Sequence, residues 1–164
     1  MSSLILETGS GSNPDSNTYI SIEFFKEEIE KGYHLEGRSD HDIERAIHRA
    51  MAYLEQHWAS FKGEKTSRDQ PLEWPRIGVS VGRFMLPSNQ IPKDLKIALV
   101  YIAFFALDND LLPDQPIEAN RVIIKEQVEA IGVEYDLERI KNLTLRKAKI
   151  LNKFLDKKPI FRRT

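Results

Sequence analysis

The stretch Phe61–Val79, FKGEKTSRDQPLEWPRIGV, lies between the two most clearly helical segments of this chain. Four residues that interrupt helices punctuate it: Gly63, Pro71, Pro75 and Gly78. Each proline favours extended backbone in the residue before it, so the sequence predicts an ordered, irregular crossover in place of a helix. Trp74 then has two interpretations. It plugs the seam between two helices as a structural clasp, or it belongs to an exposed recognition loop.

Hydrophobic periodicity predicts two helices before this crossover. The first covers residues 22–31 and ends at Gly32. The second begins at a cap formed by Ser39 or Asp40 and continues to Phe61. Apolar residues recur at helical spacing along the second helix, so we expect it to form one wall of the core.

A short strand and a third helix are predicted after the crossover. Residues 83–86 form the strand, and Pro92 opens the helix at the position in the first turn that proline favours. Residues 97–107 of this helix are apolar on every side. A helix of this kind is buried all round, either in the core of its own fold or between subunits.

The last part of the chain predicts a hairpin and a final helix. Residues 122–135 alternate loosely between apolar and polar and contain Gly132, which is typical of a β-hairpin. A helix follows over about residues 142–157, and Pro159 should end it.

These elements predict a mainly α fold, a small helical bundle of about four helices with a short β-hairpin and flexible terminal arms. We divide the chain into an N-terminal arm of residues 1–20, a helical domain of residues 21–158 and a basic C-terminal arm of residues 159–164. The hairpin lies near residues 121–136 of the helical domain.

Composition excludes several classes of protein. The 164 residues include no cysteine, so a disulfide framework and a cysteine metal site are both impossible. The longest apolar run, residues 97–107, is shorter than the ~20 residues that a membrane span needs. The first residues have no basic region before their short apolar run, unlike a signal peptide. We therefore expect a soluble, intracellular protein with no membrane partner.

The net charge of −1 conceals an uneven distribution. Residues 139–164 carry ten lysines and arginines against one acidic residue, which leaves 24 acidic against 14 basic residues in residues 1–138. An acidic body with a basic end favours a polyanion or an acidic protein surface as partner.

Basic residues at three- and four-residue steps make a stripe on the last predicted helix: Arg146, Lys149, Lys153 and Lys157. Three more basic residues extend it into the tail: Lys158, Arg162 and Arg163. One interpretation is the solvated face of a packed helix. The other is a surface that contacts DNA or an acidic protein partner.

Candidate catalytic and metal-binding patterns are weak. Glu44 and His48 are four residues apart, a spacing that places two ligands on one helix face, but no further ligands complete a site. The Gly9-Ser-Gly11 pair lacks the lysine and the preceding strand of a phosphate loop, and no nucleophile turn occurs. We expect no catalytic residue, cofactor or metal. A hydrolase or metal enzyme built around Glu44 and His48 is the weaker alternative.

Several short motifs occur in a characteristic order: Asn17-Thr18-Tyr19-Ile20-Ser21, Arg49-Ala50, Tyr53-Leu54, Phe61-Lys62-Gly63, Lys65-Thr66, Gln70, Leu72, Trp74-Pro75-Arg76, Gly78-Val79, Ile91-Pro92, Leu95-Lys96 and Leu111-Leu112-Pro113. In this order and spacing the chain resembles a family of phage proteins described as DnaT-like single-stranded-DNA-binding proteins. The resemblance covers most of the chain, and its most specific part is the crossover stretch.

The resemblance implies a structural role. Such proteins are similar in plan to the head–tail connector adaptors of tailed phages, small helical proteins that form a ring, commonly a dodecamer, beneath the portal. It implies a virion protein made in the host cytoplasm, located at the head–tail interface with DNA passing through its channel. Its partners would be further copies of itself, the portal protein and a stopper or tail-completion protein, and the basic end would contact the portal or DNA. The unusually basic last helix departs from the expected pattern and leaves room for direct DNA contact.

The alternative implied by the same resemblance is a single-stranded-DNA-binding accessory protein. Such a protein needs aromatic side chains exposed along a positive groove, so that bases can stack on them. Three aromatic residues are the predicted platforms: Trp74, Tyr33 and Phe161. In the adaptor interpretation, the crossover is a structural signature made of six residues: Phe61, Gly63, Trp74, Pro75, Arg76 and Gly78. It would hold two helices at a fixed angle, with Arg76 free to reach a neighbouring subunit.

Overall fold

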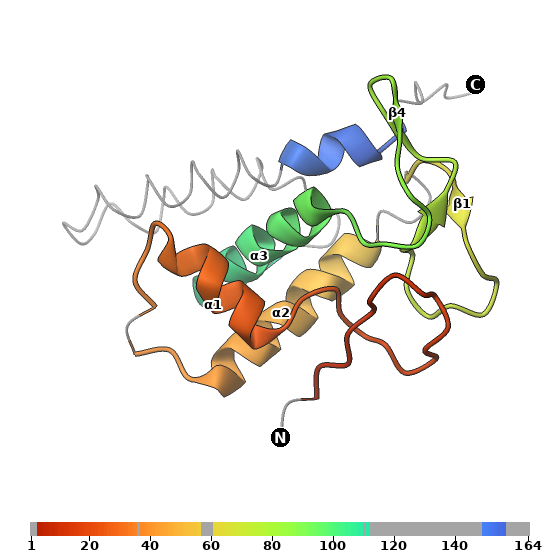
Figure 1. Cartoon of the computed structure of the whole chain (residues 1–164). Helices are drawn as coiled ribbons and strands as arrows, with labels where there is room; N and C mark the ends of the chain where they lie inside the picture. Colours follow the sequence, from red (N-terminus) through yellow and green to blue (C-terminus); the bar gives the residue numbers. More distant parts are fainter. Residues whose placement is uncertain (1–2, 36, 57–60, 110, 112–148, 157–164) are drawn as a thin grey trace, which may run out of the picture.

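A computed structural model describes residues 3–35, 37–56, 61–109, 111 and 149–156 of the chain (Figure 1). Within these residues the elements follow in this order: α1 (Ile22–Glu30), α2 (Asp40–Glu55), β1 (Glu64–Lys65), β2 (Arg76–Ile77), β3 (Ser80–Val81), β4 (Phe84–Met85), α3 (Lys93–Asp108) and the 3-10 helix η2 (Lys149–Phe154). The predicted hairpin near residues 121–136, most of the last predicted helix and the tail 159–164 lie outside the described residues, so the domain division stays a prediction.

The prediction of a mainly α bundle of about four helices is wrong. In the described residues, three α-helices are joined by two small antiparallel sheets, so the fold is mixed α and β. The β1–β2 sheet lies within the crossover, which was expected to be irregular, and the β3–β4 hairpin directly follows it. Gly63, Gly78 and Gly82 adopt positive φ angles of 68°, 77° and 62°, and these let the chain turn tightly enough to pair with itself.

The two helices before the crossover begin where the sequence predicts. Ser21 accepts a hydrogen bond from the Phe24 amide, and Ser39 accepts one from the Asp42 amide, so each serine caps an otherwise unpaired helix start. Helix α2 ends at Glu55, earlier than predicted. Phe61 is not helical, and forms an isolated antiparallel bridge with Leu155.

Helix α3 is the centre of the core, and it packs against both other helices and η2 (Figure 1). Nine of its 16 residues are buried within the monomer. Leu95, Leu99 and Ile102 have no exposed surface, and they meet Ile43 and Ile47 of α2 in one apolar cluster. Burial in the chain's own core therefore accounts for most of the apolar surface of this helix, while Ile97, Phe104 and Leu107 are partly buried.

Each small sheet has a defined register. In the first, Glu64 pairs with Ile77 and Lys65 with Arg76. In the second, a tight hairpin, Ser80 pairs with Met85 and Val81 with Phe84. The strand predicted at residues 83–86 is thus confirmed as β4.

The N-terminal segment is not the flexible arm that we expected. Glu7 is buried, and its carboxylate accepts hydrogen bonds from the amides of Gly9 and Gly11 and from the hydroxyl of Ser16. Leu6 forms a parallel bridge with Thr18. A buried carboxylate with three donors fixes the loop in place. In the part of the chain that the structure describes, no helix is long and apolar enough to cross a membrane.

Candidate nucleic-acid interface

Trp74 is the anchor of the crossover. Only 1% of its surface is exposed, and its ring meets the rings of Phe61 and Phe154 edge-on at centroid distances of 5.8 and 5.5 Å. Trp74 is therefore buried as the structural interpretation requires, and the stacking-platform prediction for Trp74 is wrong. We use "clasp" below for residues 61–79 together with the part of η2 that they contact.

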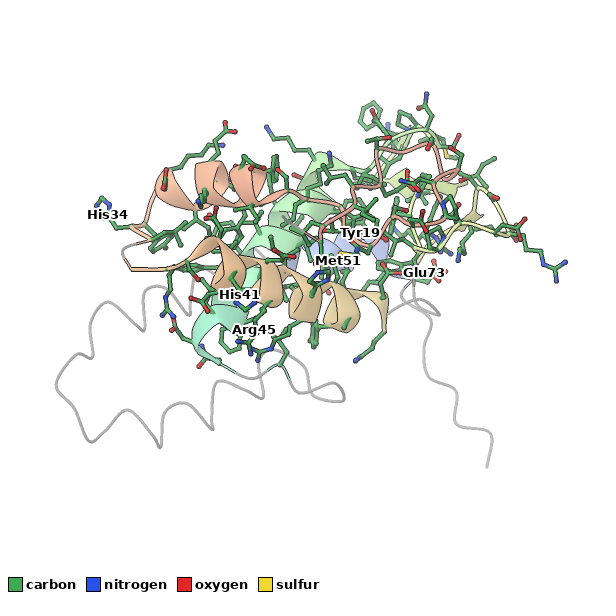
Figure 2. All side chains as sticks on the ribbon, turned by 90° about the horizontal axis from the view of Figure 1, so that it is seen from below. Tyr19, His34, His41, Arg45, Met51 and Glu73 are labelled. Atoms are coloured by element: carbon green, nitrogen blue, oxygen red, sulfur yellow. The ribbon has the colours of Figure 1, made fainter. Side chains whose placement is uncertain are left out.

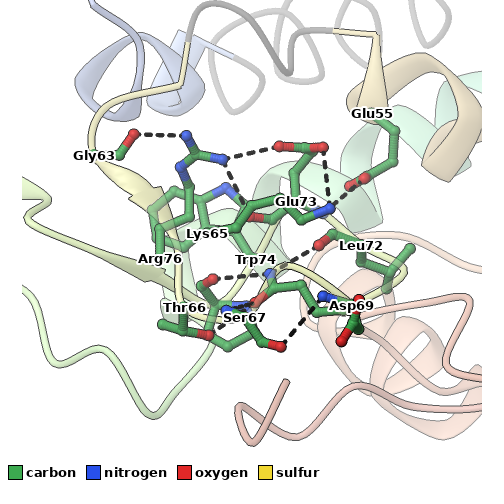
Figure 3. A network of polar contacts seen from close by, with 12 residues as sticks. Glu55, Gly63, Lys65, Thr66, Ser67, Asp69, Leu72, Glu73, Trp74 and Arg76 are labelled. Carbon is green, nitrogen blue, oxygen red and sulfur yellow. Dashed lines mark hydrogen bonds and ion pairs between the residues drawn. The ribbon is translucent and has the colours of Figure 1, made fainter. Parts of the chain in front are cut away.

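Arg76 is a structural residue of the clasp. Its guanidinium donates to the carbonyl oxygens of Lys62 and Gly63 at 2.8 and 2.7 Å and to the Glu73 carboxylate at 2.9 Å (Figure 3). The residue is buried. The expectation that Arg76 is free to reach a neighbouring subunit is therefore wrong, because its donors already pair β2 with the chain that leads into β1.

Gln70 holds the long loop between β1 and β2, a role that the sequence did not reveal. Its amide oxygen accepts from the Thr66 hydroxyl at 2.8 Å and from the Ser67 amide at 3.0 Å. Its amide nitrogen donates to the carbonyl oxygens of Leu72 and Pro75 at 2.8 and 3.0 Å. One buried side chain thus satisfies four partners in a segment that has little sheet or helix of its own.

The clasp is joined to the helices by a second set of hydrogen bonds. Tyr19 donates from its hydroxyl to Glu55 at 2.6 Å and accepts from the Trp74 amide at 3.1 Å. The other Glu55 oxygen accepts from the Glu73 amide at 2.9 Å (Figure 3). Burial raises the pKa of Glu55, and burial together with the Glu55 charge raises the pKa of Tyr19 well above its ordinary value. Tyr19 lies among the packed side chains in Figure 2.

The clasp also carries the β3–β4 hairpin and ties it to η2. The Lys62 ammonium donates to the carbonyl oxygen of Ser80 at 3.2 Å and to that of Lys153 at 2.8 Å. The Leu86 amide donates to the Val79 carbonyl oxygen at 2.8 Å and closes the base of the hairpin. Figure 1 shows the hairpin and η2 at the same end of the molecule.

The hairpin carries an exposed apolar tip, which we define as residues 82–85. Phe84 is 79% exposed and Met85 is 64% exposed, and Arg83 beside them is exposed too. The signal for this was present in the sequence. Adjacent residues of a strand point to opposite faces, so two consecutive large apolar residues on a two-stranded ribbon cannot both face one core.

The charge around this tip differs from that of the rest of the body. Residues 74–93 contain three basic residues and no acidic residue, although residues 1–138 as a whole are strongly acidic. Residues 139–155 also contain no acidic residue. The Lys62 bridge joins the first of these stretches to η2, which belongs to the second.

The structure places two of the seven predicted basic contact residues. Lys149 begins η2, and Lys153 lies near its end. The Lys153 ammonium is paired with Asp94 of α3 and lies 5.3 Å from the centre of the Phe154 ring, so it is partly neutralised. The other five lie outside the described residues: Arg146, Lys157, Lys158, Arg162 and Arg163.

The remaining predicted platforms are less accessible than Phe84. Tyr33 is half-buried, with its ring 5.5 Å from that of Phe104, and Phe161 lies outside the described residues. Phe84 was not among the predicted platforms, and it is the most exposed of the large hydrophobic residues that the structure describes.

Glu44 and His48 both contact the hydroxyl of Ser3 in the N-terminal segment. The Ser3 hydroxyl donates to the Glu44 carboxylate and lies 2.9 Å from Nε2 of His48. The Ser3 hydrogen bonds lower the pKa of Glu44. In a catalytic triad the carboxylate orients the histidine, whereas here it binds the serine directly. Among the described residues no group of three or more histidines and acidic residues could hold a metal ion, and His34 points away from the body (Figure 2).

Comparison with known proteins identifies a family. Residues 2–162 match the family described as "Putative DnaT-like ssDNA binding protein". Comparison with curated proteins and with solved structures gives no match. The match covers nearly the whole chain, including the clasp and the basic end. The chain therefore belongs to the family of DnaT-like ssDNA-binding proteins.

Proposed function

We propose that this protein binds single-stranded DNA at the end of the molecule where the clasp, the hairpin and the C-terminal segment meet. One observation carries the proposal: Lys62 joins Ser80 and Lys153, so the two acid-free stretches of the chain lie side by side. Family membership supports the single-stranded form of DNA as ligand.

The distribution of charge supports binding at this end. A DNA strand is repelled by acidic surface and attracted by lysines and arginines that replace its counterions. The body carries 24 acidic against 14 basic residues, and residues 139–164 carry ten basic residues against one acidic residue. Charge therefore favours binding of a DNA strand at the basic end of the chain over binding at the helical body.

Salt dependence tests the proposal. Affinity for a fluorescein-labelled oligothymidine is measured by anisotropy over a series of salt concentrations, for the natural protein and for a variant with Lys149, Lys157, Arg162 and Arg163 changed to Gln. We expect the wild-type affinity to fall steeply with salt. Each phosphate contact on single-stranded DNA contributes roughly 0.7 to the slope of log affinity against log salt concentration. The variant, which lacks four basic side chains, should therefore have a slope smaller in magnitude by up to about three.

Arg45 on α2 provides the control, because it is exposed and lies within the helical body (Figure 2). Arg45→Gln removes one positive charge from the helical body, and the single change Arg162→Gln removes one from the basic end of the sequence. Only Arg162→Gln should reduce the dependence of DNA affinity on salt concentration. Equal slopes for both variants, or no binding by the natural protein at low salt, would contradict the proposal.

A second candidate function is the head–tail connector ring. The observation in its favour is the opposite charge of two parts of one chain, because the basic end of one copy can pair with the acidic body of the next. The portal protein, a stopper or tail-completion protein and a location in the virion belong to this proposal. Native mass spectrometry with a candidate portal protein tests it, and a strict monomer that never engages the portal would count against it.

A further inference from the structure

We propose that Phe84 is a stacking platform for an unpaired base of single-stranded DNA, with Arg83 positioned to contact the strand's backbone. The inference rests on the proposed function. It identifies the Phe84 ring as the group that would distinguish single-stranded DNA from a duplex. In a duplex the faces of the bases are covered by their neighbours, whereas an unpaired base can stack on an aromatic side chain.

The first support is the unusual exposure of the Phe84 ring. It is 79% exposed, while Phe25 and Phe154 are 0% and 1% exposed. Phe84 takes no part in the apolar cluster of the body. A phenylalanine in this position adds little to folding through burial, and its ring is accessible to a ligand.

The second support is that the tip is held in place before any ligand binds. The register of β3 and β4 places Phe84 opposite Val81, which is packed against the core. Lys62 binds Ser80 at one side of the hairpin base, and the Leu86–Val79 hydrogen bond closes it. A platform with fixed backbone loses little conformational entropy on binding, which favours affinity.

The third support is the size and charge of the surface. Two large apolar side chains, Phe84 and Met85, protrude beside Arg83. A fully buried aromatic side chain covers about 150–250 Å², so this tip falls short of the roughly 800 Å² per partner of a stable protein interface. It does match one or two nucleobases. The acid-free sequence of residues 74–93 suits the adjoining phosphates.

The experiment compares single- and double-stranded ligands. Anisotropy is measured with a labelled oligothymidine and with a duplex of equal length, for the natural protein and for Phe84→Ala, Phe84→Leu and Phe84→Trp. Loss of one base–aromatic stack should weaken single-strand binding roughly tenfold in the Ala and Leu variants. Duplex affinity should change little. Phe84→Trp should retain single-strand affinity, because indole also stacks.

A spectroscopic readout separates stacking from simple apolar contact. The indole of Phe84→Trp would be exposed, whereas Trp74 is buried. Addition of oligothymidine should quench the fluorescence of this variant more strongly than that of the natural protein. Ile5→Ala, at an apolar residue that is 40% exposed in the N-terminal segment, is the control and should bind both ligands like the natural protein. Circular dichroism and thermal unfolding check that each variant is folded.

The outcomes separate the two proposals. Binding of oligothymidine by the natural protein, with equal affinity in Phe84→Ala, overturns the stacking role and leaves the proposed function standing. Wild-type affinity in Phe84→Leu also overturns stacking. Absence of binding by the natural protein contradicts both proposals. If Phe84→Ala instead changes the oligomeric state in sedimentation velocity and leaves DNA affinity unchanged, the tip binds a second copy and the inference is wrong.

Discussion

The helical part and the clasp are stabilised by different forces. The helices α1, α2 and α3 share an apolar core in which Ile47, Leu54 and Leu99 are fully buried. The clasp has two-residue strands, and side chains replace most of the backbone pairing that longer strands would provide. Arg76 and Gln70 together make eight hydrogen bonds within it.

This difference implies different tolerance to change. Apolar packing is non-directional, so the helical part should accept other hydrophobic residues of similar volume. Hydrogen bonds in the clasp depend on the fork of Arg76 and the amide of Gln70, and a buried partner left unpaired costs about 1–3 kcal/mol. The surface that we propose for DNA therefore lies on the clasp, which should tolerate fewer substitutions than the helical part. Four predictions test this contrast.

Trp74→Ala should have the largest effect, because it removes the side chain that Phe61 and Phe154 enclose. We expect a loss of about 3–5 kcal/mol in the free energy of unfolding, measured by urea denaturation. Native-state hydrogen exchange should show the clasp amides losing more protection than those of α3. Leu99→Ala in α3 is the matched comparison and should lower protection in both regions. Equal loss in both regions for Trp74→Ala would show that the two parts unfold as one unit.

Gly63→Ala should be the next most damaging. Gly63 has a φ of 68°, and a Cβ there would lie 2.2 Å from the carbonyl oxygen of Ile77. We expect a loss of at least about 2 kcal/mol, from left-handed strain plus displacement of β2. Gly37→Ala is the control, because Gly37 has a φ of 74° and no atom of the described residues within 4 Å. If both variants lose the same stability in urea denaturation, the contact with Ile77 contributes nothing.

Arg76→Lys should lower the free energy of unfolding by about 2 kcal/mol, although charge is conserved. A lysine ammonium cannot span the Lys62, Gly63 and Glu73 acceptors that the guanidinium fork reaches. Thermal unfolding measures the loss. The comparison variant is Lys26→Arg at an exposed ion pair with Asp40, where the melting temperature should hardly change. A stable Arg76→Lys protein would show that positive charge alone is sufficient in the clasp.

Glu55→Gln should change the pH dependence of stability by a smaller amount. Burial raises the pKa of Glu55, so the folded state binds its proton more tightly than the unfolded state does. The natural protein should therefore lose stability relative to Glu55→Gln as pH rises from the ordinary glutamate pKa through the raised folded value. Glu44 and Asp42, whose pKa values are lowered by hydrogen bonds, act in the opposite direction in both proteins and cancel in the comparison.

Urea denaturation at several pH values measures this difference. A difference that stays constant across the pH range would show that Glu55 titrates alike in the folded and unfolded chains. The same variant retains one acceptor for the Glu73 amide, so the clasp should stay closed.

Much of the helical part could be predicted from the sequence, because periodicity and caps are local signals. The starts of α1 and α2 were predicted correctly, and α3 begins one residue later than predicted, with Pro92 as its N-cap. The β1–β2 sheet of the clasp could not be predicted, since it depends on pairings such as Glu64 with Ile77 that no periodicity indicates. Of the two interpretations of Trp74, the structure shows the buried one, whereas Arg76 was predicted to be free and is buried as well.

The candidate site was predicted less well, for physical reasons. Charge counting located the basic end of the chain but could not show that Lys153 pairs with Asp94. Strand alternation indicates that Phe84 and Met85 cannot both face the core, but the exposure of both depends on how the hairpin packs against the body, which the sequence pattern does not show. Side chains such as Gln70, which bind several backbone groups of their own loop, also cannot be recognised until the loop is folded.

The contact between Lys62 and Lys153 has a consequence for the order of events during synthesis. The two residues are 91 positions apart, so the helices can pack on the ribosome well before the second partner of Lys62 has emerged. Contacts of such long range carry a large loop-closure cost and form late in folding. We expect a nascent chain to pack α1, α2 and α3 first and to close its clasp only after Lys153 has emerged. The end of the molecule that we propose for DNA binding would then be the last part of the protein to fold.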